Sequence, residues 1–243
     1  MNFSSEILHN VIEQTWPAQK YIENGAWRFR EGSGGGKRVS AVTLENNNCK
    51  YDIKTAEDFM SNELKHRPLF LIRETQIELD KELEARGYLI IDQMNIYAAP
   101  AKCICNVPPP KLSTFEIWEP IEIQKDIWRK GGLSSEKLKV MDRVLGHKTS
   151  ILMRWENKPA GAAFVATYDY FAMVHALEVT HTMRRKGVAK LAIRKAALWS
   201  LTKNAHTLLV LCTKQNVAAN RLYTSLKMEL VSNFHYRVPR DLK

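Results

Sequence analysis

Hydrophobic positions in the first hundred residues repeat with two different periods. In residues 6–16 they recur every three or four positions, as on one face of an amphipathic helix. In residues 26–30 they alternate with polar positions, which is typical of a half-buried strand. Thr55 is the expected N-cap of the second helix, and Gly87 is the expected left-handed residue after the third. The predicted helices span residues 6–16, 55–65 and 76–86, and the predicted strands span 26–30, 39–42, 69–72, 88–91 and 94–99.

The rest of the chain begins with a helix and a run of strands and ends with helices and strands in alternation. Residues 208–212 form an unbroken apolar run, which is typical of a strand covered on both faces of a sheet. The whole pattern predicts an α/β (α+β) fold class with a central sheet. The predicted helices span residues 134–145, 188–203 and 216–227, and the predicted strands span 150–155, 160–167, 171–179, 208–212 and 230–238.

A proline run divides the chain where its charge changes. Pro108, Pro109 and Pro110 can continue neither a helix nor a central strand and favour an extended connector. We therefore expect an N-terminal unit (1–105), a linker (106–111) and a C-terminal unit (112–243). The formal charge is +10, yet residues 1–110 carry 13 basic and 15 acidic side chains, whereas residues 111–243 carry 23 and 11. The basic half should attract an anion, such as nucleic acid, an anionic surface or a phosphorylated cofactor.

Composition and cysteine spacing exclude several classes of protein. With 45% hydrophobic residues, the 243-residue chain is neither disordered nor fibrous. No apolar run is long enough to span a bilayer, and the charged N-terminus does not resemble a secretory signal, so we expect a cytoplasmic protein. Of the cysteines at positions 49, 103, 105 and 212, only Cys103 and Cys105 are closely spaced, and no histidine pair has zinc-ligand spacing. We expect reduced thiols and no metal.

Two glycine-containing segments are candidate phosphate sites. The loop at residues 32–38 fails the spacing of a phosphate-binding loop, because Glu31 and Arg38 stand where Gly and Ser or Thr are needed. It is expected to be a flexible hairpin loop. The second segment, residues 184–189, follows a strand and opens a helix, and Gly187 removes a Cβ where an anion would approach the free backbone N–H groups. A solvated basic turn is the alternative.

Two motifs in the C-terminal unit resemble those of the GNAT acetyltransferase superfamily. Arg184-x-x-Gly187-x-Ala189 matches its Arg/Gln-x-x-Gly-x-Gly/Ala signature, and Asn216-x-x-Ala219-x-x-Leu222-Tyr223 is similar to its second motif. The resemblance covers residues 113–243 and implies the GNAT fold, a mixed central sheet flanked by helices. The family usually has a Gly after Leu-Tyr at the helix end, and Lys227 stands there, where a left-handed conformation would cost about 1 kcal/mol relative to Gly.

The resemblance implies transfer of an acetyl group from acetyl-CoA, as co-substrate, to an amine. By family analogy the strand residues Leu177 and Val179 hold the acetyl-CoA arm, and a backbone N–H near Val179 polarises the thioester carbonyl. The segment Arg184, Arg185, Lys186, Gly187, Val188, Ala189 binds the pyrophosphate, mostly through backbone N–H groups. Tyr223 is the general acid toward sulfur, or else a core aromatic residue. Asn216 contacts the pantetheine arm, caps its helix, or does both.

The general base and the acceptor are less constrained by the sequence. Glu178 is the preferred base, with His175, His181, His235 or a base acting through water as alternatives. The acceptor pocket is expected near residues 118–133, Trp155 and residues 235–236, with contributions from the N-terminal unit. The sequence identifies neither the amine acceptor, which could be a small molecule or a peptide, nor the choice between monomer and homodimer.

The N-terminal unit resembles a degenerate, partial copy of the same fold without the basic glycine signature, so two tandem GNAT-like units are expected. A non-catalytic CoA-binding protein and a basic nucleic-acid-binding module are the alternative functions. Because CoA is itself a polyanion, nucleic acid is not needed to explain the charge.

Overall fold

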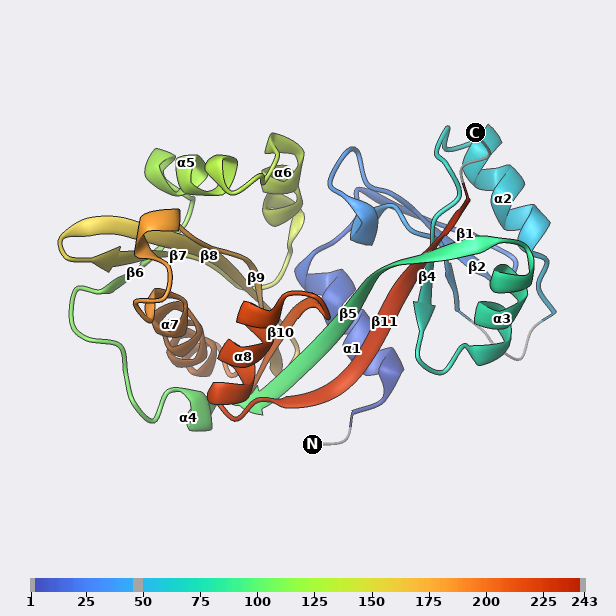
Figure 1. The fold of residues 1–243 in the computed structure, drawn as a ribbon. Coiled ribbons are helices and arrows are strands. Elements are labelled where there is room, and N and C mark those ends of the chain that lie inside the picture. Colours follow the sequence, from blue (N-terminus) through green and yellow to red (C-terminus); the bar gives the residue numbers. More distant parts are fainter. Residues whose placement is uncertain (1–2, 46–49, 241–243) are drawn as a thin grey trace.

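The computed structural model describes residues 3–45 and 50–240, which form one eight-stranded and one three-stranded sheet (Figure 1). The large sheet has the order β4-β11-β5-β10-β9-β8-β7-β6, and only its β9–β10 pair is parallel. It is therefore the expected mixed sheet. Its strands are β4 (Phe70–Arg73), β5 (Tyr88–Pro100), β6 (Thr114–Ile117), β7 (Lys148–Trp155), β8 (Lys158–Tyr168), β9 (Phe171–Val179), β10 (Thr207–Thr213) and β11 (Glu229–Pro239). The small sheet contains β1 (Lys20–Asn24), β2 (Trp27–Glu31) and β3 (Thr43–Leu44).

Strand β5, which precedes the proline linker, pairs in one sheet with strands that follow it. It lies between β10 and β11 and is antiparallel to both, so that Ala98 pairs with Leu209 on one side and with Glu229 on the other (Figure 1). Two tandem units are therefore not confirmed, because the large sheet takes strands from both segments. Two separate strands had been expected here, but β5 is continuous. The polar interruption at Asp92, with a φ of +42°, lies at a register shift against β11.

Helices cover both faces of the large sheet. The face formed by Ala162, Phe164 and Ala166 of β8 packs against α5 and α6, whereas Ala163 and Val165 face α7 on the opposite side. This alternation explains why β8 is apolar from Ala160 to Ala166. On the first side lie α1 (Ser5–Thr15), α5 (Glu122–Lys130) and α6 (Ser135–Arg143), and on the second lie α4 (Ala101–Ile104), α7 (Val188–Thr202) and α8 (Val217–Ser225) (Figure 1).

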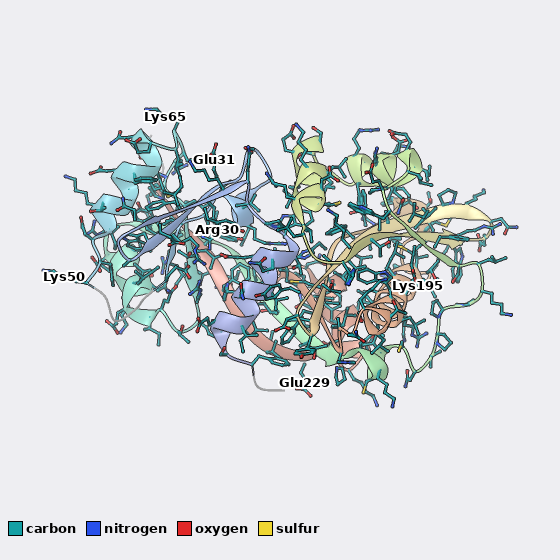
Figure 2. All side chains as sticks on the ribbon, turned by 180° about the vertical axis from the view of Figure 1, so that it is seen from behind. Arg30, Glu31, Lys50, Lys65, Lys195 and Glu229 are labelled. Carbon is teal, nitrogen blue, oxygen red and sulfur yellow. The ribbon has the colours of Figure 1, made fainter. Side chains whose placement is uncertain are left out.

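The three-stranded sheet packs with α2 (Ile53–Asn62) and α3 (Ile77–Ala85) around a separate apolar cluster. Buried Arg30 of β2 connects this sheet to α1 through an ion pair with Glu13, and its Nη1 donates to the Thr43 hydroxyl of β3 at 2.9 Å. Figure 2 shows Arg30 inside the molecule, whereas Lys50 and Lys65 project from its periphery. The small sheet is thus connected to α1 by a buried charge pair.

The glycine-rich loop is packed against the C-terminal unit instead of forming a flexible hairpin loop. A Cβ on Gly35 would lie 2.7 Å from a methyl group of Val140 on α6. The loop leads into a 3₁₀ helix (Lys37–Val39), so the strand predicted at residues 39–42 is wrong, and β3 begins only at Thr43. The alternating apolar residues here pack into three different clusters rather than onto one face of a sheet.

Other predicted boundaries shift by a few residues. Helix α2 is capped by Asp52, which accepts from the backbone N–H groups of Lys54 and Thr55 at 3.1 Å, and not by Thr55 itself. Gly87 follows α3 with the expected positive φ, +82°. The prolines lie between α4 and β6 without regular structure. Strands β1, β3 and β6 and helices α4 and α5 have no counterpart among the predicted elements.

Candidate active site

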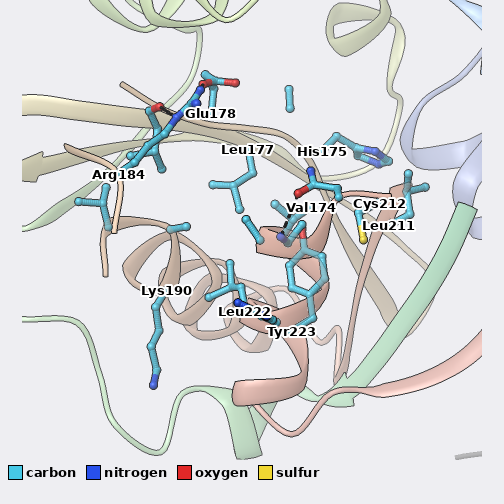
Figure 3. Close-up of a pocket in the computed structure, with 18 of the residues that line it drawn as sticks. Val174, His175, Leu177, Glu178, Arg184, Lys190, Leu211, Cys212, Leu222 and Tyr223 are labelled. Carbon is cyan, nitrogen blue, oxygen red and sulfur yellow. Dashed lines mark hydrogen bonds and ion pairs between the residues drawn. The ribbon is translucent and has the colours of Figure 1, made fainter. Parts of the chain in front are cut away.

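A cavity opens where β9 and β10 diverge. The two strands pair only as far as Val174 and Val210, although β9 continues to Val179 and β10 to Thr213. The register of β9 also shifts against β8 near Ala176, which has a φ of +48°. The resulting cavity of about 860 Å³ lies between these strand ends and the N-terminal ends of α7 and α8 (Figure 3).

Most of the residues expected at the site line this cavity. They come from the end of β9, from the turn before α7 and from α8, and so from three separate parts of the chain that the sheet brings together. The residues are Leu177, Glu178, Val179, Arg184, Arg185, Gly187, Val188, Ala189, Asn216 and Tyr223.

Lys186 is the exception. Its ammonium group lies 3.6 Å from a carboxylate oxygen of Glu156, in the turn between β7 and β8, and 4.0 Å from the sulfur of Met183. It does not belong to the cavity wall. The basic triplet therefore contributes two of its three side chains to the cavity, and Lys186 bonds instead to the neighbouring hairpin.

The N-terminus of α7 presents free backbone donors to the cavity. Gly187 is its N-cap, with a φ of +84°, and a Cβ there would meet nothing within 4 Å. Arg185 is also left-handed, with a φ of +65°. Within the described ranges, the backbone N–H groups of residues 185–189 have no backbone acceptor. The free donors and the positive end of the helix dipole therefore lie together at the cavity.

Tyr223 rises from α8 toward Val174 at the inner part of the cavity (Figure 3). Its side chain is 5% exposed and its ring centroid lies 5.6 Å from that of Tyr97. Burial, with smaller contributions from Cys212 and Tyr97, raises the pKa of Tyr223 above its usual value. The phenol is therefore protonated at neutral pH and can act as a proton donor. Lys227, after α8, has a φ of +58°, which is the left-handed conformation expected at that position.

Glu178 lies on β9 and lines both the large cavity and a neighbouring hollow of about 120 Å³. Its carboxylate accepts a hydrogen bond from the Arg184 guanidinium at 3.1 Å, and Arg184 also donates to the carbonyl oxygen of Val179 at 3.2 Å. On its other side the carboxylate lies over Gly131, where a Cβ would come within 2.8 Å of Oε2. Glu178 is thus held between the turn before α7 and the loop after α5.

The three histidines considered as bases lie in different environments. His175 is buried, and its Nδ1 and Nε2 lie 3.1 Å from Arg38 and 2.9 Å from Thr15, so both nitrogens are engaged. Burial first, and then the Arg38 charge, hold its pKa well below the usual value. His235 lies 2.8 Å from Asp80 on α3 and does not line the cavity, and neither does the exposed His181.

Asn216 caps α8, because its side-chain oxygen accepts from the N–H of Ala219 at 3.0 Å, and it also lines the cavity. Several further lining residues were not anticipated, among them Arg38, Lys190, Cys212 and Arg221. Cys212 and Arg221 neighbour the anticipated motif along β10 and α8, so helical and strand spacing could have indicated them. Burial raises the pKa of the Cys212 thiol to about 11.

The acceptor pocket expected from the sequence is only partly assembled. Of residues 118–133, Trp128, Gly131, Gly132 and Leu133 line the smaller hollow beside Glu178. Trp155 packs against the cluster under α7 instead. Tyr236 reaches the site only indirectly, through a hydrogen bond with Arg38.

The described ranges contain neither a group of metal ligands nor a helix that could span a membrane. There, no three His, Cys, Asp or Glu side chains are grouped so that they could hold a metal ion. No helix of residues 3–45 or 50–240 has the length and apolarity needed to cross a bilayer. Cys103, Cys105 and Cys212 are free thiols, and Cys49 lies outside the described residues.

Comparison with known proteins identifies the family. Residues 116–228 match the acetyltransferase (GNAT) family. An uncharacterized N-acetyltransferase of Bacillus subtilis, YobR, is 22% identical over 96% of this chain and 98% of its own length. The structure of a GCN5-related N-acetyltransferase from Kribbella flavida superposes with a TM-score of 0.75 at 15% identity, covering 99% of this chain and 97% of that one. A tandem GNAT protein from the clavulanic acid biosynthesis pathway covers 72% and 65%, respectively, with a TM-score of 0.52 at 11% identity. Residues 116–228 thus belong to the GNAT superfamily of acyltransferases, and the chain as a whole shares the fold of a GNAT structure.

Proposed function

We propose that the protein is an acetyl-CoA-dependent N-acetyltransferase that acts on a primary amine. The observation that carries this proposal is that one cavity joins the free N–H groups of the α7 N-terminus to Tyr223 and Glu178. Bound acetyl-CoA supplies an acetyl group activated as a thioester. The chain must then hold the phosphates, receive a proton from the amine and return one to the sulfur.

The turn before α7 suits the phosphates of CoA. The N–H groups of Arg185 to Ala189 supply donors, and the guanidinium of Arg185 adds charge beside them. Gly187 keeps this approach free of a side chain. Asn216 lies at the wall between this turn and Tyr223, where it can meet the pantetheine arm while it caps α8.

Tyr223 and Glu178 are the residues to which we assign the two proton transfers. The raised pKa of Tyr223 keeps its hydroxyl protonated, so that it can donate a proton to the departing sulfur. Glu178 lines the cavity and also the smaller hollow beside the loop after α5. We assign it to accept the proton of the amine, directly or through water. Because its Oε1 is bonded to Arg184, Oε2 is the oxygen that we assign to this role.

Release of free CoA thiol in the presence of a panel of amines tests the proposal. Small amines, polyamines, amino acids, aminoglycosides and peptides are supplied with acetyl-CoA, and a positive amine is verified by mass spectrometry of its acetylated product. Tyr223→Phe should lower turnover by about 10²-fold or more while CoA affinity stays unchanged. Unchanged turnover in this variant would remove Tyr223 from the mechanism.

The alternative functions give different outcomes in the same experiments. CoA binding without thiol release from any amine would favour a non-catalytic CoA-binding protein. Weak CoA binding together with strong, salt-sensitive binding of DNA or RNA would favour a nucleic-acid-binding module.

We also propose that residues 1–105 descend from a second GNAT-like unit that has lost the basic glycine signature, and that residues 112–243 form the catalytic unit. The likeness to a tandem GNAT protein over 72% of the chain supports this. The shared sheet then reflects an exchange in which β5 of the first unit fills the place between β10 and β11 of the second.

A further inference from the structure

Arg38 brings a positive charge from the N-terminal segment into the wall of the cavity. It lies at the end of the glycine-rich loop, within the 3₁₀ helix before β3. Its guanidinium stacks over the Trp16 ring, 5.7 Å from the centroid. It is only partly buried, because the cavity keeps one side of it open. The cavity is therefore lined by a cation that the two GNAT motifs do not supply.

The hydrogen-bond partners of Arg38 are uncharged. Thr15 donates its hydroxyl proton to the Val11 carbonyl oxygen at 2.6 Å, so its oxygen accepts from Nε2 of His175. Since Nε2 carries the proton, Nδ1 of this neutral histidine accepts from Nη1 of Arg38 at 3.1 Å. The Tyr236 hydroxyl provides a second neutral partner.

No carboxylate within the described ranges pairs with Arg38, and its Nε has no hydrogen-bond partner there. Three other arginines of the interior each pair with a carboxylate. Arg30 pairs with Glu13, Arg73 lies 2.9 Å from Glu45, and Arg237 lies 2.8 Å from Asp80. Removing a charged guanidinium from water without a counter-ion costs free energy, unless another group compensates its charge. Its place in a cavity wall indicates that the compensating anion comes from a ligand.

Arg38 reaches the cavity from the side opposite the proposed CoA site. His175, to which it is bonded, packs against Trp16 and Phe164, which belong to the cluster under α5 and α6. Tyr223 belongs instead to the cluster under α7 and α8. An amine that meets the acetyl group beside Glu178 would enter from the α5 and α6 side, where Arg38 lies.

We propose that the acceptor is a small amine that also carries a carboxylate, an amino acid or a close analogue, and that Arg38 binds this carboxylate. This inference rests on the proposed acetyltransferase function and adds the substrate class to it. A guanidinium is suited to carboxylate recognition because its N–H donors match the two oxygens. The N-terminal segment then contributes directly to acceptor selection.

Binding to the CoA-saturated protein tests the inference separately from catalysis. Isothermal titration calorimetry compares the twenty standard L-amino acids with their decarboxylated amines, and with O-phosphoethanolamine as an amine carrying a phosphate. The same ligands are then tested for CoA release from acetyl-CoA. The variants are Arg38→Met, Arg38→Lys and, as a matched control, Arg143→Met. Arg143 also has an unpartnered Nε but does not line the cavity.

We expect at least one amino acid to bind about 10-fold or more tightly than its decarboxylated amine. Arg38→Met should abolish that preference while leaving CoA affinity and amine binding unchanged, Arg38→Lys should restore part of it, and Arg143→Met should keep all of it. Thermal unfolding of each variant verifies that it is folded, and the reduced preference of Arg38→Lys for the carboxylate provides a second test should the methionine variant not fold.

The remaining outcomes separate the inference from the proposed function. If no amino acid binds better than its amine, or if O-phosphoethanolamine binds more tightly than every amino acid, the carboxylate assignment is overturned. CoA release that is indifferent to the carboxylate and to Arg38→Met also overturns it, while acetyl transfer stands. Carboxylate-dependent binding without any CoA release keeps Arg38 as an anion-binding residue and removes the transferase proposal.

Discussion

Replacing Gly187 with tryptophan tests the proposed phosphate site without destroying the fold. Gly187 has a φ of +84°, and a Cβ there would meet nothing within 4 Å. The expected structural cost is therefore only that of a left-handed non-glycine residue, about 1 kcal/mol. For a chain of this size, that loss lowers the midpoint of thermal unfolding by about 2–4 °C.

The effect on ligand binding should be much larger than the effect on stability. CoA at about 100 times its dissociation constant stabilises the wild-type protein by about 2.7 kcal/mol, which raises the unfolding midpoint by about 5–11 °C. An indole ring at position 187 would occupy the approach to the free N–H groups of residues 185–189, so this rise should vanish in Gly187→Trp. Gly187→Ala is the control, since it has the same backbone strain with a minimal side chain.

Differential scanning fluorimetry with and without CoA measures both quantities. A CoA-dependent rise in Gly187→Trp as large as in the wild type would refute the phosphate assignment. A midpoint more than about 10 °C lower without ligand would instead show that the space around Gly187 is not open.

Three further substitutions probe other features. Lys227→Gly should stabilise the protein by about 1 kcal/mol in urea denaturation, because Lys227 has a φ of +58°, and an unchanged midpoint would contradict the left-handed turn. Gly131→Ala should lower turnover but not CoA affinity, because its Cβ would come within 2.8 Å of Oε2 of Glu178, and full activity would argue against the position of that carboxylate. Burial lowers the pKa of His9 to about 3, so between that pH and about 6.5 the unfolded chain holds a proton that the folded chain lacks, and the folded state loses stability as the pH is lowered through this range. Between pH 7 and 4.5, the free energy of unfolding of His9→Phe should therefore fall by about 2 kcal/mol less than that of the wild type, as measured by urea denaturation. An equal fall in both proteins would contradict the neutral buried histidine.

The parts of the site that were predicted from the sequence are those that lie close together along the chain. The turn before α7 needs free N–H groups and a glycine within six residues, so residues 184–189 indicate it without tertiary information. Asn216 and Tyr223 share one helix in the same way, and both line the cavity as expected. Lys186 could not be distinguished from Arg185 by sequence, because only its ion pair with Glu156 turns it away from the cavity.

Arg38 could not be found in this way. It is 137 positions from His175, and only the packing of α1 and the glycine-rich loop against the large sheet brings the two side chains together. Strand β5 was divided in two for a related reason. The polar pair Asp92 and Gln93 has the composition of a turn, and only the partner strand β11 reveals a register shift within one continuous strand.

The position of β5 has a consequence for how the protein is made. During synthesis β5 emerges before both of its neighbours, and β11, which covers its second edge, comes last. The large sheet therefore cannot close until residues 229–239 have been synthesised, and the early chain must keep an unpaired strand from associating with other chains. Pairing over such sequence separation slows folding. Deletion of residues 1–105 would remove β4 and β5 from the large sheet, and truncation after residue 228 would remove β11, which lies between them, so neither segment is a dispensable appendage of the other.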